Sequence, residues 1–182
     1  FAASGPSTDP VMTRTLILMR HAKSSWAEPG MADIDRPLNR RGRGDAPRMG
    51  EWLKSAGLKP DLVLVSPARR TRDTFAGLLE GYGSRLPSEI VPAIYEAEPV
   101  DLLELVRAQR VPTVMLLGHN PGCEQLLRLA VREPDLNVGY HKLMPTAAVY
   151  VIEFEDEWAD IDAGGGTVTS HARPKLLATE ED

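Results

Sequence analysis

Short runs of consecutive apolar residues recur along the chain, and in the segments between them apolar residues fall at every third or fourth position. The runs at about 16–19, 62–65 and 114–117 are typical of strands that are buried on both faces of a sheet. The other segments have the spacing of amphipathic helices. We expect helices that end near Gly57 and Gly83, further helices at about 100–108 and 123–131, a short strand near 89–91, and antiparallel strands within 146–154 and 166–172.

This alternation of strands and helices determines the expected fold class. It predicts an α/β fold, a three-layer αβα sandwich with a mostly parallel central sheet, right-handed crossovers and an antiparallel edge near the C-terminus. A length of 182 residues fits one domain. We expect this single domain at residues 12–178, a disordered extension or cloning remnant at 1–11, and an acidic tail at 179–182.

Composition and charge exclude several classes of protein. The formal net charge of -5 argues against a general nucleic-acid binder, because affinity for a phosphate backbone depends on accumulated Lys and Arg. No apolar run is long enough to cross a bilayer, so we expect no membrane association. The single cysteine, Cys123, excludes an internal disulfide framework and fits a cytoplasmic protein. We expect Cys123 to be a small buried residue at a helix start rather than a nucleophile.

Each of the three long apolar strands ends on residues that can carry chemistry. Arg20 and His21 follow the first strand, Ser66 and then the pair 69–70 follow the second, and His119 follows the third. In open α/β sheets, ligands bind beyond the carboxyl ends of the strands, so these endings are expected to meet. Around them there is no acidic cluster for a hard metal and no glycine-rich P-loop.

Arginines and histidines gathered in this way would suit a phosphoryl group. Guanidinium groups grip phosphoryl oxygens with forked hydrogen bonds and supply the charge that many phosphatases take from metals. A neutral imidazole between them can attack phosphorus, and the nearby arginines disfavour its protonation. A single histidine at a strand end is more often an ordinary hydrogen-bonded loop residue, so it is the ordered combination of three endings that favours the functional interpretation.

The same segments resemble motifs of the histidine phosphatase superfamily, which includes the cofactor-dependent phosphoglycerate mutases, and within it the small SixA-type phosphohistidine phosphatases. "LMRHAKSSW" is similar to the opening motif of that subgroup, "DIDRPLNRRGRGDA" to the segment before its first helix, "SPARRTRDT" to its second-strand motif and "LLGHNPG" to its third. The resemblance spans about residues 14–176. It implies a phosphoglycerate mutase-like fold. It also implies an enzyme that needs neither a cofactor nor a metal.

Carried over residue by residue, the resemblance makes His21 the nucleophile that forms a covalent phosphohistidine intermediate. Arg20 and Arg70 become phosphate ligands, and His119 becomes a second pocket histidine that contacts the phosphoryl oxygens. Ser24 is either a further phosphate ligand at the mouth of the pocket or part of a solvated loop.

The general acid of many superfamily members has no clear counterpart in this sequence. Glu96 in "IYEAEPVDLL" is the nearest candidate, and an ordinary loop carboxylate before a helix is an equal alternative. An alkoxide leaving group needs a proton from such an acid, whereas an imidazole that is protonated on its other nitrogen leaves readily without one. This difference favours phosphohistidine as the substrate.

The expected function is therefore a metal-independent phosphatase that acts on phosphohistidine in a protein. The chain has little spare length for the insertions that roof the site in superfamily members acting on small sugars, so its pocket could accept a side chain presented by another protein. The alternatives are a broad-specificity phosphomonoesterase for small metabolites and a phosphate- or phosphoprotein-binding module without turnover. His141 and His171 are expected to be surface or packing residues.

Overall fold

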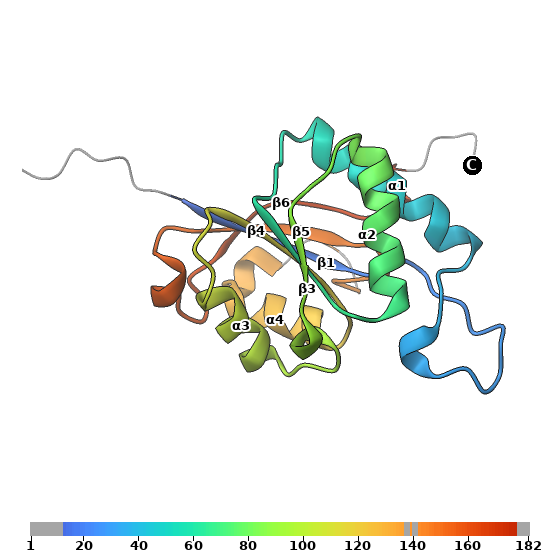
Figure 1. Ribbon diagram of the computed structural model, residues 1–182. Coiled ribbons are helices and arrows are strands. Elements are labelled where there is room, and N and C mark those ends of the chain that lie inside the picture. The colour runs from blue at the N-terminus through green and yellow to red at the C-terminus, as the bar shows by residue number, and fades with distance from the viewer. Residues whose placement is uncertain (1–12, 137–138, 140–141, 178–182) are drawn as a thin grey trace, which may run out of the picture.

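A computed structural model describes residues 13–136, 139 and 142–177, and this part of the chain is built around a six-stranded sheet (Figure 1). The sheet order is β3-β2-β4-β1-β5-β6. The first four strands in this order are parallel neighbours, whereas β5 is antiparallel to β1 and β6 is antiparallel to β5. The strands are β1 (Arg14–Arg20), β2 (Leu62–Val65), β3 (Ser88–Ile90), β4 (Thr113–Gly118), β5 (Val149–Phe154) and β6 (Thr167–Ala172).

Helices cover both faces of this sheet and give the fold its three layers (Figure 1). One face packs against α1 (Arg40–Ser55) and α2 (Arg69–Tyr82), and the other against α3 (Pro99–Arg107) and α4 (Gly122–Ala130). The mixed α/β sandwich predicted from the sequence is thus confirmed, including its antiparallel edge. The remaining short elements are η1 (Asp33–Asp35), η2 (Pro92–Ile94), η3 (Glu133–Leu136), η4 (Trp158–Asp160) and α5 (Pro174–Leu177).

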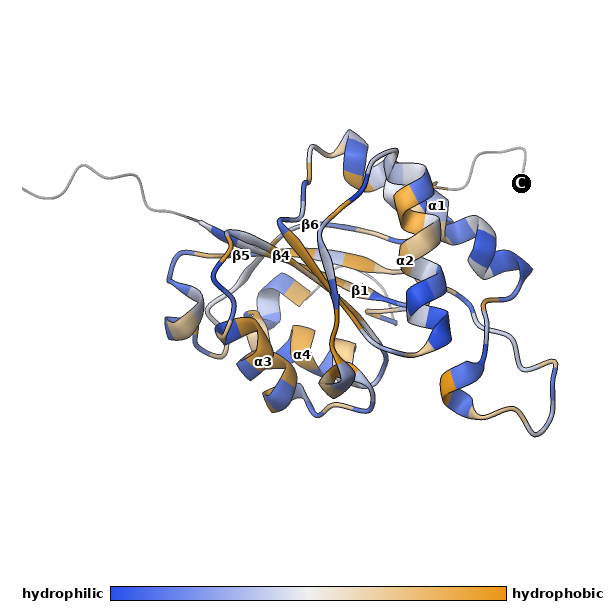
Figure 2. Cartoon of the chain, in the orientation of Figure 1, coloured by the Kyte–Doolittle hydropathy of each residue, from blue (hydrophilic) through white to orange (hydrophobic). Residues whose placement is uncertain are grey.

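The central strand β1 supplies side chains to both halves of the core. Ile17 and Met19 pack on the side of α1 and α2, while Leu16 and Leu18 pack on the side of α3 and α4. All four are at most 1% exposed, and full burial of an aliphatic side chain of this size contributes about 1.5–3 kcal/mol. Figure 2 shows the same distribution, with hydrophobic residues concentrated in the strands. A strand fixed on both faces holds the residue that follows it in a defined place.

The ends of three parallel strands meet at one edge of the sheet, as the sequence predicts. Arg20 pairs with Gly118 at the ends of β1 and β4. The backbone N–H of His21 donates to the Gly118 carbonyl at 3.0 Å, and the backbone N–H of Ser66, just after β2, donates to the Leu117 carbonyl at 3.2 Å. Register along the sheet therefore brings the candidate residues of all three strand endings together.

Helices α1 and α2 are in direct backbone contact through glycines. A Cβ atom at Gly50 would overlap the carbonyl oxygen of Leu78, and one at Gly81 would overlap the carbonyl oxygen of Pro47. This close approach fixes α2 against α1. It also fixes the start of α2, which carries Arg70.

The sequence-based boundaries differ from the structure by a residue or so. The short strand expected near 89–91 is at Ser88–Ile90, and the helix expected at 100–108 is at Pro99–Arg107. His141 and the expected extension and tail at 1–11 and 179–182 lie outside the described residues. Within the part of the chain that is described, no helix is long and apolar enough to cross a membrane.

Candidate active site

His21 is the first residue after β1, and the backbone holds it from both sides. Its N–H is bound by Gly118, and its carbonyl accepts a hydrogen bond from the N–H of Ala147 at 2.9 Å. The ring nitrogen Nδ1 lies 2.7 Å from the carbonyl oxygen of Ala22. Because a carbonyl oxygen can only accept, Nδ1 must carry the hydrogen, and in the neutral ring Nε2 then keeps the lone pair.

The surroundings of His21 favour that neutral ring. Burial, together with the charges of His119, Arg20 and Arg70, lowers the pKa of His21 to about 3, although the hydrogen bond to the carbonyl of Ala22 acts in the opposite direction. A group whose pKa lies this far below 7 is unprotonated at physiological pH. Nε2 is therefore available as a nucleophile without the help of a separate base.

We expect His21 to remain neutral at pH 5, where an ordinary imidazole with a pKa of about 6.5 is mostly protonated. Nuclear magnetic resonance of the ¹⁵N-labelled imidazole nitrogens, followed from pH 8 to pH 4 and assigned by comparison with His21→Ala, measures both the titration and the tautomer. The expected spectrum has a protonated Nδ1 and an unprotonated Nε2 throughout. A titration midpoint near 6.5, or a hydrogen on Nε2, would contradict this arrangement.

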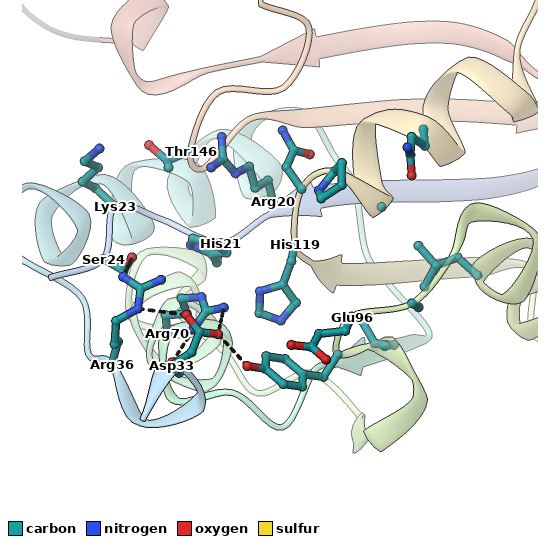
Figure 3. A pocket seen from close by; sticks show the side chains of 18 of the residues that line it. Arg20, His21, Lys23, Ser24, Asp33, Arg36, Arg70, Glu96, His119 and Thr146 are labelled. Carbon is teal, nitrogen blue, oxygen red and sulfur yellow. Dashed lines mark hydrogen bonds and ion pairs between the residues drawn. The ribbon is translucent and has the colours of Figure 1, made fainter. Parts of the chain in front are cut away.

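Two arginines flank His21 (Figure 3). Arg20, from the last position of β1, donates from one terminal nitrogen to the carbonyl of Met144 at 3.1 Å. Arg70, from the first turn of α2, is only 5% exposed. The neighbouring arginines of α2 face elsewhere, since Arg69 pairs with Asp73 at 3.5 Å and Arg72 donates to the carbonyl of Pro67 at 3.0 Å. Arg70 is therefore the arginine of this helix that lies in the wall of the pocket.

Three buried nitrogens around His21 lack a hydrogen-bond partner among the described residues. They are Nε of Arg20, Nε of Arg70 and Nδ1 of His119. Leaving a polar group buried and unpaired costs about 1–3 kcal/mol, so such groups are rare unless a ligand satisfies them. Donors on two guanidinium groups and an imidazole fit a compact anion with several oxygens, such as a phosphoryl group.

His119 faces His21 across the pocket, with 5.3 Å between the ring centroids. Burial and the charge of Arg70 lower the pKa of His119 to about 4, so this ring is also neutral at pH 7. Its Nε2 lies 2.7 Å from Oγ of Ser66, and that oxygen accepts a hydrogen bond from the N–H of Ala68. This favours a serine hydroxyl that donates to Nε2, which places the hydrogen of His119 on Nδ1, the unpaired nitrogen.

Asp33, in η1, connects the start of α2 with two segments around the site, those of Arg36 and Tyr95. Arg70 donates to its backbone carbonyl at 2.7 Å and to its Oδ2 at 3.0 Å. Tyr95 donates its hydroxyl to the same Oδ2 at 2.5 Å, and Nε of Arg36 donates to Oδ1 at 3.1 Å. The hydrogen bond from Tyr95, together with those from Arg70 and Arg36, lowers the pKa of Asp33 to about 2. The resulting carboxylate holds the guanidinium of Arg70 in place beside His21 (Figure 3).

Sequence reasoning missed this arrangement. Asp33 lies in the three-residue helix η1 and Tyr95 directly follows η2, and elements this short have no periodic pattern that marks a residue as buried or paired. Arg36 lies in an arginine-rich stretch that is typical of a solvated helix face, yet it is only 8% exposed. The available signal was the position of Asp33 three residues before Arg36, since such a pair can interact within a single turn.

The site opens into a cavity of about 520 Å³ that also contains Ser24, Lys23 and Glu96 in its wall. Oγ of Ser24 accepts a hydrogen bond from Arg36 at 2.8 Å, so this serine is part of the wall and not of a solvated loop. Glu96 is exposed and has a φ of 60°, a left-handed conformation that costs a residue other than glycine about 1 kcal/mol. Figure 3 shows Glu96 on the side of the pocket nearest His119. The described residues contain no cluster of His, Cys, Asp and Glu that could hold a metal ion.

Comparison with known proteins identifies the superfamily to which the chain belongs. The model of the histidine phosphatase superfamily, branch 1, matches residues 16–105, a range that includes Arg20, His21 and Arg70. The chain belongs to this superfamily. Membership supports a phosphatase activity on a phosphorylated substrate.

The chain is also similar to individual proteins of known structure or sequence. It is 29% identical to a candidate phosphohistidine phosphatase, SixA, from Agrobacterium tumefaciens, whose structure superposes with a TM-score of 0.78 over 88% of this chain and 98% of that one. A second candidate SixA structure, from Nakamurella multipartitia, is also 29% identical, with a TM-score of 0.72 over 91% and 99% of the two chains. An uncharacterized chloroplastic protein of Arabidopsis thaliana is 32% identical over 177 residues, which cover 91% of this chain and 77% of that protein.

Proposed function

We propose that this protein is a metal-independent phosphatase that removes the phosphoryl group from phosphohistidine in a protein. The observation that carries this proposal is the buried ring of His21, whose Nδ1 lies 2.7 Å from the carbonyl oxygen of Ala22 and which is surrounded by buried, unpaired nitrogens of Arg20, Arg70 and His119. The likeness to the two SixA structures adds support for the substrate class.

In the proposed first step, Nε2 of His21 attacks phosphorus. A new N–P bond forms as the bond to the substrate imidazole breaks, and the departing ring leaves neutral because its other nitrogen already carries a proton. Arg20, Arg70 and His119 bind the three phosphoryl oxygens and stabilise the charge that spreads over them. Water then attacks the phosphoryl group on His21, which releases inorganic phosphate and restores the free ring.

The proposed role of Glu96 is that of a proton donor or a base for this water. Its exposed side chain on the loop before α3 is less firmly placed against a leaving group than a buried carboxyl would be. An alkyl phosphate, whose alkoxide must be protonated as it leaves, should therefore be a poor substrate. The exposed position of Glu96 therefore supports a phosphatase for phosphohistidine over a broad-specificity phosphomonoesterase.

The test compares a protein that carries phosphohistidine with an alkyl phosphate, both in the presence of EDTA. We expect phosphate release from phosphohistidine that is insensitive to EDTA and at least 100-fold faster, measured as kcat/KM, than release from the alkyl phosphate. Comparable rates on both substrates would favour the phosphomonoesterase. Tight binding of the phosphoprotein with no release would favour a binding module.

A further inference from the structure

A tryptophan at the mouth of the pocket is exposed to an unusual degree. Trp26 is 74% exposed and belongs to the pocket wall, whereas Trp158 is 2% exposed and part of the core. Large aromatic side chains dominate the energetics of protein interfaces, and one that is mostly exposed adds little apolar burial to its own fold. The position of Trp26 therefore calls for an explanation outside the core.

The indole of Trp26 rests on a rigid support. The guanidinium carbon of Arg36 lies 3.5 Å from its ring centroid, a cation–π contact. Arg36 is itself held by Oγ of Ser24 at 2.8 Å, by the carbonyl of Ser25 at 3.3 Å and by Oδ1 of Asp33. One face of the indole is thus covered by a fixed cation, and its exposed surface is the opposite face and the edges.

A continuous set of contacts joins this indole to the phosphate-binding arginine. Trp26 stacks on Arg36, Arg36 donates to Asp33, and Asp33 accepts from Arg70. The exposed indole face consequently has a fixed position relative to His21. A phosphoryl group small enough to be bound by Arg20 and Arg70 would not extend to the rim, whereas the polypeptide that carries a phosphorylated side chain would cross it.

We propose that Trp26, backed by Arg36, is the surface on which the polypeptide flanking the phosphorylated histidine of the substrate packs. This inference rests on the proposed function and names how its substrate is recognised. Charged residues of the pocket wall favour one orientation of the substrate segment. Lys23 precedes Trp26 by three positions and lines the pocket, while Glu96 and Glu98 line it from the loop before α3. A substrate segment with an acidic group toward Lys23 and a basic group toward the glutamates fits this mouth.

The test uses two substrates with the same scissile bond and the same leaving ring. One is phosphoimidazole, and the other is a histidine-containing protein phosphorylated with phosphoramidate. For Trp26→Ala, we expect the ratio of kcat/KM for the phosphoprotein to kcat/KM for phosphoimidazole to fall at least tenfold, mainly through KM. Trp26→Phe should keep most of the ratio, because a flat ring remains on Arg36. Leu176→Ala, which shortens a side chain that is 52% exposed on α5, is the matched control and should leave the ratio unchanged.

Other outcomes are equally decisive. An equal loss on both substrates would mean that Trp26 acts on the pocket through Arg36, and no loss on either would mean that the substrate polypeptide does not touch it. A change from dimer to monomer in Trp26→Ala, seen by analytical ultracentrifugation with the ratio intact, would assign the indole to a contact between copies of the chain. Each of these results overturns the inference. A wild-type protein that does not release phosphate from the phosphoprotein would instead refute the proposed function itself.

Discussion

His21→Ala is expected to abolish phosphate release, with a fall in kcat/KM on the order of 10⁴-fold or more, because the variant lacks the nucleophile on which the covalent step depends. The arginines and His119 remain in place, so binding of inorganic phosphate should persist in the variant. Loss of turnover with retained binding assigns His21 to the chemistry and not to the folding of the site. Steady-state kinetics and isothermal titration with inorganic phosphate measure the two quantities.

A matched control and a direct trap sharpen this test. His171→Ala changes another histidine, one that stacks on Tyr150 with 5.4 Å between ring centroids on β5 and β6, and it should keep kcat/KM within about twofold of wild type. The wild-type reaction is quenched rapidly in alkali, where a phosphoramidate is stable and a phosphate ester of serine is less so. A phosphorylated peptide that contains His21 should then be recovered. Substantial turnover by His21→Ala, or phosphate recovered on a different residue, would refute the covalent role.

Gly50→Ala is expected to destabilise the protein by about 3 kcal/mol or more, the upper part of the range for overpacked sites. The added methyl group would overlap the Leu78 carbonyl oxygen, so α1 and α2 must move apart and their shared core must open. Equilibrium unfolding in urea measures the change as a shift of the midpoint. Because the start of α2 carries Arg70, we also expect phosphatase activity to fall in the fraction that stays folded.

Gly44→Ala provides the opposite result within the same helix. Nothing lies within 4 Å of a Cβ at this exposed position of α1. Alanine is a better helix former than glycine, so this substitution should stabilise the protein by about 0.5–1 kcal/mol. If Gly50→Ala were tolerated as well as Gly44→Ala, the two helices would not be in backbone contact.

The strands and the residues at their ends could be predicted from the sequence because both depend on local patterns. Long apolar runs reported the buried strands, and the order of the strand endings placed His21, Arg70 and His119 at one edge of the sheet. A parallel sheet brings the carboxyl ends of its strands to the same edge, whatever the conformation of the loops that follow them. The central part of the site therefore follows from topology and strand register.

The parts that the sequence did not reveal depend on contacts between distant segments. Asp33 and Tyr95 are 62 positions apart, and the short helices η1 and η2, in or next to which they lie, are too brief for periodicity to mark a partner. Gly81 lies within a predicted helix, and no pattern in the sequence marks it as the position where a missing side chain permits contact with Pro47. Such pairings arise from the angle at which the loops and helices meet, and no local pattern encodes that angle.

The hydrogen bond from Nδ1 of His21 to the carbonyl of Ala22 has a regiochemical consequence. With Nδ1 engaged, the phosphoryl group of the proposed intermediate can reside only on the other ring nitrogen, so the enzyme-bound species would be the τ isomer of phosphohistidine. An antibody selective for the τ isomer should detect it, and one selective for the π isomer should not. The backbone of a single residue thus determines which constitutional isomer is formed.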